Sequence, residues 1–113
     1  MTGSSIDRLL NRADFLSAAS RGKKWVAQGV IVQLLVQPDQ DSIRFGLTAS
    51  KRVGGAVERN RARRRLRALA LELLPASGFP PCDVVLIAKT TTVHRKAPDL
   101  RRDLLWCLSK LKP

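Results

Sequence analysis

Residues 51–67 read KRVGGAVERNRARRRLR, and the fold and the charge of the chain are both organised around this stretch. The pair Gly54-Gly55 interrupts regular structure, and the residues after it predict a helix from about Ala56 to Leu74. At about 100° per residue, the small and aliphatic side chains of this helix share one arc less than a third of the way round: Ala62, Leu66, Leu69, Ala70 and Leu73. We expect that arc to pack against a sheet.

The remainder of the helix is basic. Residues 51–67 hold eight basic residues and one acid, and so contribute +7 of the net charge of +12. All six basic residues between positions 59 and 67 are arginines. The helical wheel predicts three groups outside the apolar arc: Asn60, Arg64 and Arg67 opposite it, Arg61 and Arg65 in a second exposed row, and Arg59 and Arg63 flanking it.

A solvated helix face stabilised by ion pairs does not account for this pattern, because Glu58 and Glu72 are the only acids on the helix. Guanidinium groups bind phosphates with two hydrogen bonds and stack on bases, which lysine does not do. The pattern therefore favours binding to a phosphate backbone. A structural face and an anionic membrane surface are the alternatives, and the helix alone does not separate RNA from DNA.

On the N-terminal side, residues 1–6 form a loose start, and Asn11 begins a short helix that runs to about Ser20 and ends at Gly22. One side of this helix is expected to present Phe15, Leu16 and Ala19. Residues 29–36 and 43–50 have the composition of strands, and the second alternates apolar and polar side chains. The turn residues between them predict an antiparallel hairpin.

On the C-terminal side, residues 83–88 are an apolar run that predicts a central strand. Pro98 opens a last helix with a stripe of leucines at positions 100, 104, 108 and 111. The order is α-β-β-α-β-α, and helices on one face of a small sheet form a two-layer α/β sandwich of the α+β class. We expect one domain over residues 1–113.

Composition excludes several classes of function. Cys82 and Cys107 lie in apolar segments without a C-x-x-C motif, and His94 has no partner at metal-ligand spacing, so a metal site is not expected. The nine acids are scattered and there is one histidine, so no site for a stand-alone nuclease is present. No stretch is apolar enough for a signal peptide or a membrane span, which predicts a cytoplasmic protein. Neither a small-molecule substrate nor a membrane partner is indicated.

In order along the chain, the sequence resembles the signature of the protein subunit of bacterial ribonuclease P at Ser50-Lys51-Arg52-Val53-Gly54, Ala56-Val57, Arg59-Asn60-Arg61, Arg63-Arg64, Leu66 and Arg67. Thinner resemblance covers most of the chain. Arg8-Leu9, Asp14-Phe15 and Gly22 resemble the family's first helix, Phe45-Gly46-Leu47 resembles the strand before the signature, and Asp83-Val84 through Ala88-Lys89 resembles a later strand. The resemblance implies an α/β sandwich with a left-handed βαβ crossover. It also implies a role beside a catalytic RNA that removes the 5′ leader from precursor tRNA, with Mg²⁺ in the holoenzyme and the chemistry in the RNA.

The family pattern also implies which residues bind each RNA. It places the RNA subunit on Arg59, Asn60, Arg61, Arg63, Arg64, Arg65 and Arg67. It places the single-stranded leader in a cleft between the first helix, the basic helix and the sheet, with contacts from Phe15, Lys51, Arg52 and Lys89. For Phe15 the alternative is a core residue that anchors its short helix. No catalytic residue, metal ligand or cofactor of the protein alone is expected. The rival interpretations are a ribosomal or RNA-assembly protein, a DNA-binding regulator and an autonomous nuclease.

Overall fold

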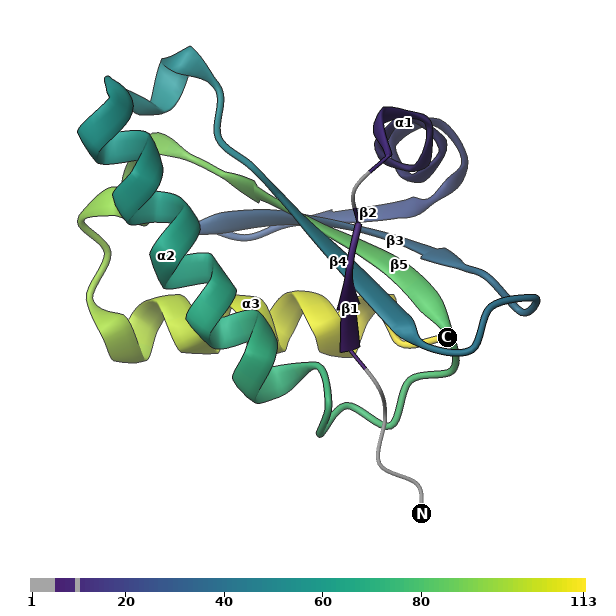
Figure 1. Ribbon diagram of the computed structural model, residues 1–113. Helices are drawn as coiled ribbons and strands as arrows, with labels where there is room; N and C mark the ends of the chain where they lie inside the picture. The colour runs from purple at the N-terminus through teal and green to yellow at the C-terminus, as the bar shows by residue number, and fades with distance from the viewer. Residues whose placement is uncertain (1–5, 10) are drawn as a thin grey trace.

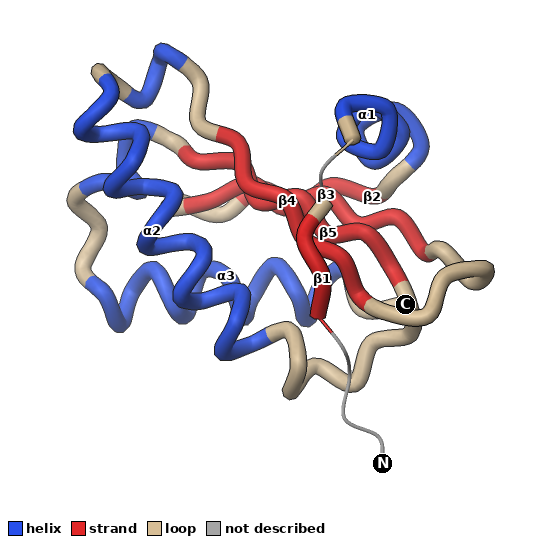
Figure 2. The backbone as a smooth tube through the Cα atoms, viewed as in Figure 1, coloured by secondary structure: helices blue, strands red, loops and turns tan. Residues whose placement is uncertain are grey.

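The computed structural model describes residues 6–9 and 11–113, and Figures 1 and 2 show a sheet with helices on both of its faces. The elements follow in the order β1 (Ile6–Arg8), α1 (Arg12–Arg21), β2 (Lys23–Val26), β3 (Val30–Val36), β4 (Ile43–Thr48), α2 (Ala56–Leu73), β5 (Cys82–Ala88) and α3 (Ala97–Leu111). Two short 3₁₀ helices, Lys51–Val53 and Thr90–Val93, precede α2 and α3. The expected loose start ends at Ile6, which begins β1, and residues 1–5 lie outside the described residues.

The strands form one five-stranded sheet in the order β1-β4-β5-β3-β2. β5 is central, as its continuous apolar run predicts: it pairs parallel with β4 and antiparallel with β3. The expected hairpin between residues 29–36 and 43–50 is therefore wrong, because β5 lies between these strands. The βαβ unit that the resemblance implies is present as β4-α2-β5.

The two faces of the sheet bury different sets of side chains. β5 directs Cys82, Val84 and Leu86 to the core under α2 and α3, and Val85 and Ile87 to a smaller cluster under α1. The α+β class is confirmed, but the helices do not all lie on one face, because α1 covers the opposite face from α2 and α3 (Figure 2). The sheet is consequently buried on both sides around β5.

Local chemistry fixes the start of α2. Ser50 accepts a hydrogen bond from the Arg52 backbone N–H at 3.3 Å, and Gly54 has a φ of 143°, a conformation that side chains with a Cβ rarely adopt. The Gly55 N–H donates to Glu58 Oε1 at 2.8 Å, which satisfies a donor that the helix leaves free. From there Ala62, Leu66 and Ala70 are fully buried and Leu69 is partly buried, so the predicted apolar arc is confirmed.

The first helix differs from its prediction in the face that it buries. Phe15 and Ala18 pack against the sheet, whereas Leu16 is 55% exposed and Ala19 is exposed. Asn11 precedes the helix without a side-chain capping bond. The helix is held over the sheet by charge as well: Arg44 of β4 contacts Asp14 at 3.4 Å and the fully buried Asp83 of β5 at 2.7 Å.

Candidate nucleic-acid interface

A cleft opens where strand β1 ends, and its floor is strand β4. At Gly46 of β4 the missing side chain leaves room for the ring of Phe15 from α1, because a Cβ there would lie 2.4 Å from Phe15 Cζ. Phe45 and Leu47 complete the floor, and Leu9 closes one side. The cavity has a volume of about 190 Å³ and is bounded by α1, β1, β4 and α2.

The walls of the cleft are basic. Arg63 and Arg67 reach it from α2, and Arg8 reaches it from β1. Arg63 and Arg67 are four residues apart, so they stack on the same side of the helix. Arg63 donates to Asn60 Oδ1 at 3.1 Å and more weakly to the Ala49 carbonyl at 3.5 Å. Arg67 Nε is itself buried and has no acceptor in the described part of the chain.

The opposite flank of α2 is tied to the loop before α3. Arg61 Nε donates to the Val93 carbonyl at 2.9 Å, and Arg65 donates to the Thr92 carbonyl at 2.7 Å and also to the Arg95 carbonyl. Burial, followed by the neighbouring Arg61 charge, lowers the pKa of Arg65 below its ordinary value. The prediction of two exposed rows is therefore half wrong, because Arg65 is partly buried and its guanidinium binds backbone carbonyls.

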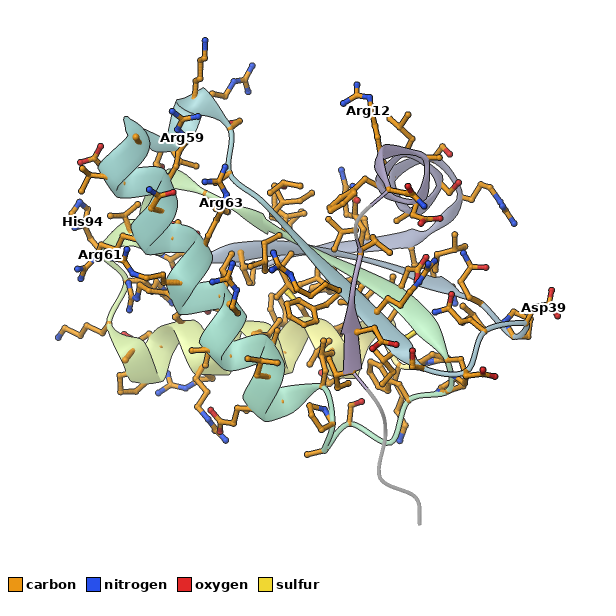
Figure 3. All side chains as sticks on the ribbon, in the orientation of Figure 1. Arg12, Asp39, Arg59, Arg61, Arg63 and His94 are labelled. Atoms are coloured by element: carbon orange, nitrogen blue, oxygen red, sulfur yellow. The ribbon has the colours of Figure 1, made fainter. Side chains whose placement is uncertain are left out.

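Figure 3 shows the two flanks of α2: Arg63 lies between the helix and β4, while Arg61 lies on the other flank, near His94. Arg67 belongs to the cleft flank and is half-buried, so its predicted place opposite the apolar arc is wrong. Arg64 and Asn60 are exposed on the outer surface, as predicted. Arg59 is partly buried, with Nε 3.4 Å from the Gly55 carbonyl.

None of the three basic residues expected to contact a leader lines the cleft. Lys51 and Arg52 are exposed on the 3₁₀ helix before α2. Lys89 follows β5, and its Nζ donates to the Ala27 carbonyl at 3.0 Å, so this charge helps to fix the turn between β2 and β3. Of the residues expected to contact the leader, Phe15 lies in the cleft. The cleft arginines were not expected to contact the leader: Arg63 and Arg67 were expected to bind the RNA subunit, and Arg8 had no expected contact.

The described residues offer little for metal or nucleophilic chemistry. No three His, Cys, Asp or Glu side chains among them gather where they could hold a metal ion. Burial, together with Asp83, raises the pKa of Cys82 to about 12, and burial and Asp103 raise that of Cys107 to about 11, so neither thiol is a ready nucleophile. Asp83 accepts hydrogen bonds from Arg44, Gln37 and Gln40. None of the helices in the described part of the chain has the length and apolar character needed to cross a bilayer.

A sequence model of the family described as Ribonuclease P matches residues 4–112 of this chain. The chain belongs to the ribonuclease P protein family. It is 42% identical over 110 residues to the ribonuclease P protein component of Paramagnetospirillum magneticum, covering 94% of this chain and 83% of that protein. The corresponding protein of Ruegeria pomeroyi is 43% identical over 111 residues, covering 96% of this chain and 88% of that protein.

Solved structures support the same assignment at the level of the fold. The ribonuclease P protein from Thermotoga maritima superposes with a TM-score of 0.79 at 22% identity, covering 95% of this chain and 99% of that one. That from Staphylococcus aureus gives a TM-score of 0.78 at 23% identity, covering 94% and 97%. The resemblance found in the signature is thus confirmed, and the chain has the family's role as a ribonuclease P protein subunit in tRNA processing.

The resemblance assigns Arg8 to the first helix of a ribonuclease P protein, and this is wrong, because Arg8 ends β1 and lines the cleft. Arg8 lies 55 residues before Arg63 in the sequence, and both reach the same cavity because β1 pairs with β4. A further sequence signal for the cleft is Gly46, a glycine inside an alternating strand, which marks a place where something approaches the backbone closely.

Proposed function

We propose that this chain holds two RNAs in ribonuclease P: the RNA subunit on the outer surface of α2, and the single-stranded 5′ leader of precursor tRNA in the cleft. The cleft carries the proposal. It joins an aromatic ring laid against Gly46 to three arginines, the combination that binds bases by stacking and phosphates by charge.

Position separates the roles of the arginines. Arg64 and Asn60 are exposed on the outer surface of α2, where they can reach a large partner, and Arg59 lies beside them. Arg63 and Arg67 line the cleft, so we propose that they contact the leader and not the RNA subunit. Arg61 and Arg65 fix the loop at residues 92–95 and so shape the outer surface next to the bound RNA.

We retain the proposed contact of Lys51 and Arg52 with the leader, because both side chains are exposed just before the N-terminus of α2. Lys89 is proposed to act through the Ala27 carbonyl that it holds. We further propose that hydrolysis belongs to the RNA, with Mg²⁺ held there. The carboxylates of the described residues do not form a metal site, and the fully buried Asp83 carboxylate is ion-paired with Arg44. That the protein acts in the cytoplasm stays a prediction.

The proposal is tested by reconstituting the holoenzyme with Arg64→Ala, Arg63→Ala and a matched control, Arg21→Ala, which removes an exposed arginine from the last turn of α1. We expect Arg64→Ala to weaken binding of the RNA subunit, and Arg63→Ala to weaken binding of precursor tRNA with a leader but not of mature tRNA. Arg21→Ala should change neither affinity. Ribosomal RNA co-purifying in place of the RNA subunit would instead favour the ribosomal or assembly interpretation.

A further inference from the structure

Both tryptophans of the chain meet at the sheet edge farthest from the cleft. β2 is the edge strand at that end of the strand order, and its Trp25 lies beside Trp106 of α3. The ring centroids are 5.6 Å apart and the ring planes meet at 84°, an edge-to-face contact. The cleft lies at the other end of the sheet, by β1 and β4, so this surface is separate from it.

This surface exposes two large apolar side chains to solvent. Trp106 is 47% exposed, and its neighbour Leu105 is 41% exposed. Trp25 is partly buried, and its indole Nε1 has no acceptor within the described residues. An exposed indole beside an exposed leucine is typical of a surface that a partner covers.

Cations frame the exposed ring at regular spacing. Arg102, Trp106 and Lys110 are four residues apart on α3 and so form one row, with successive side chains about 6 Å apart along the helix. Lys110 Nζ lies 5.8 Å from the centre of the Trp25 ring. In the part of the chain that the structure describes, Lys110 forms no ion pair, and Arg102 has only an exposed contact of 3.5 Å with Asp99.

We propose that this row binds an unpaired segment of the RNA subunit, with a base stacked on Trp106 and the adjoining phosphates on Arg102 and Lys110. Alternating aromatic and cationic groups are what single-stranded nucleic acid requires. We assign the unpaired segment to the RNA subunit because α3 lies on the same face of the sheet as α2. The two helices are joined by the Arg101–Glu72 ion pair of 2.7 Å. This step rests on the proposed contact of α2 with that RNA.

A second copy of the chain fits the surface less well. Two copies meeting at β2 would bring Lys23 and Lys24 of each against those of the other, and lysines on an edge strand oppose such pairing. Two copies meeting at α3 would juxtapose Arg102 and Lys110 of each. The charge of the surface therefore favours a polyanion over a copy of the chain.

The test measures the affinity of the full chain for the RNA subunit with Trp106→Ala, Trp106→Phe and a matched control, Leu16→Ala, which shortens an exposed leucine of α1 on the opposite face of the sheet. Trp106→Ala should bind about 5- to 150-fold more weakly, the range that loss of one stacked base gives. Trp106→Phe should restore most of the affinity because it keeps an aromatic face, and Leu16→Ala should bind as the parent does. In the parent, the RNA subunit should quench tryptophan fluorescence, and Trp106→Ala should lose most of that quenching.

Three outcomes would overturn the proposal. Parent-like affinity of Trp106→Ala for the RNA subunit removes it directly. A loss seen only for leader-bearing precursor tRNA in the assembled holoenzyme would assign the surface to the leader. A change in sedimentation without a change in RNA affinity would assign it to a protein interface. Failure of the α2 contact would show separately, as parent-like binding by Arg64→Ala.

Discussion

A single methyl group at Gly46 should disable the leader cleft without unfolding the protein. In Gly46→Ala the new Cβ would lie 2.4 Å from Phe15 Cζ, 2.5 Å from Cε1 and 3.3 Å from Leu9 Cβ. Non-bonded carbon atoms rest at about 3.5–4.0 Å, so the ring must move by about 1 Å or more. Because Ala18 is fully buried behind it on α1, the open direction is into the cavity of about 190 Å³.

Two magnitudes follow from that displacement. Overpacking costs about 1–3 kcal/mol, and we expect the lower end because the cavity can accept the ring. This corresponds to a fall of about 4–8 °C in Tm for a domain of this size. Loss of one base contact in the cleft should weaken binding of leader-bearing precursor tRNA by about 5- to 150-fold.

The assay compares holoenzymes reconstituted with the parent and with Gly46→Ala, using precursor tRNA with a long leader and mature tRNA. Phe15→Leu is the companion variant, because it removes the aromatic face without pushing on β4. It should melt within a few degrees of the parent and show the same selective loss. In the double variant the shorter leucine side chain in place of Phe15 relieves the clash, so the combined loss of stability should be less than the sum of the two single losses. Equal weakening for both substrates would refute the cleft assignment of Phe15.

Three further predictions concern other parts of the protein. Arg64→Ala should weaken binding of the RNA subunit by about 1.5–3 kcal/mol and make the slope of log affinity against log salt shallower by about one unit in a filter-binding series, and an unchanged slope would argue against a phosphate contact. Leu66→Ala should cost about 2–5 kcal/mol in urea unfolding, because Leu66 is fully buried, and Leu69→Ala should cost less because Leu69 is only partly buried. Burial acts to raise the pKa of Asp83, but hydrogen bonds from Arg44 and the neighbouring glutamines hold it below its ordinary value of 3.8. Its contribution to stability is therefore complete above that value and lost as the pH falls below it. Asp83→Asn should cost about 3–5 kcal/mol at neutral pH and remove that acid dependence from urea titrations, and a mutant that keeps it would contradict the assignment.

The extent of α2 follows from the sequence because local signals agree there. The glycine pair before Ala56, the spacing of Ala62 and Leu66 and the breaker after Leu74 all act within the helix, and the helix observed is Ala56–Leu73. Strands β1 and β2 were not predicted, since IDR and KKWV are short and mostly polar. They become strands only because neighbouring edges of the sheet accept their hydrogen bonds.

Strand pairing and arginine contacts depend on parts of the chain that are distant in sequence. The short polar connection between β3 and β4 is what a hairpin would have, yet β5 pairs with both strands. Similarly, a helical wheel gives the direction in which Arg65 leaves the helix, but it does not show that the Thr92 carbonyl lies there to accept a hydrogen bond. The continuous apolar run of residues 82–88 was the available signal, because a strand buried on both faces needs a neighbour on each side.

The central place of β5 governs when the protein can fold during synthesis. Until residues 82–88 have left the ribosome, β4 has no partner strand on its inner edge. The β2–β3 hairpin likewise lacks the strand that joins it to β4. From the synthesis of α2 until that of β5, the nascent chain therefore carries unpaired strand edges together with the cationic residues of α2. Close-range local contacts form early and the sheet closes late. A polyanion that engages the arginines before that point meets a chain whose cleft does not yet exist.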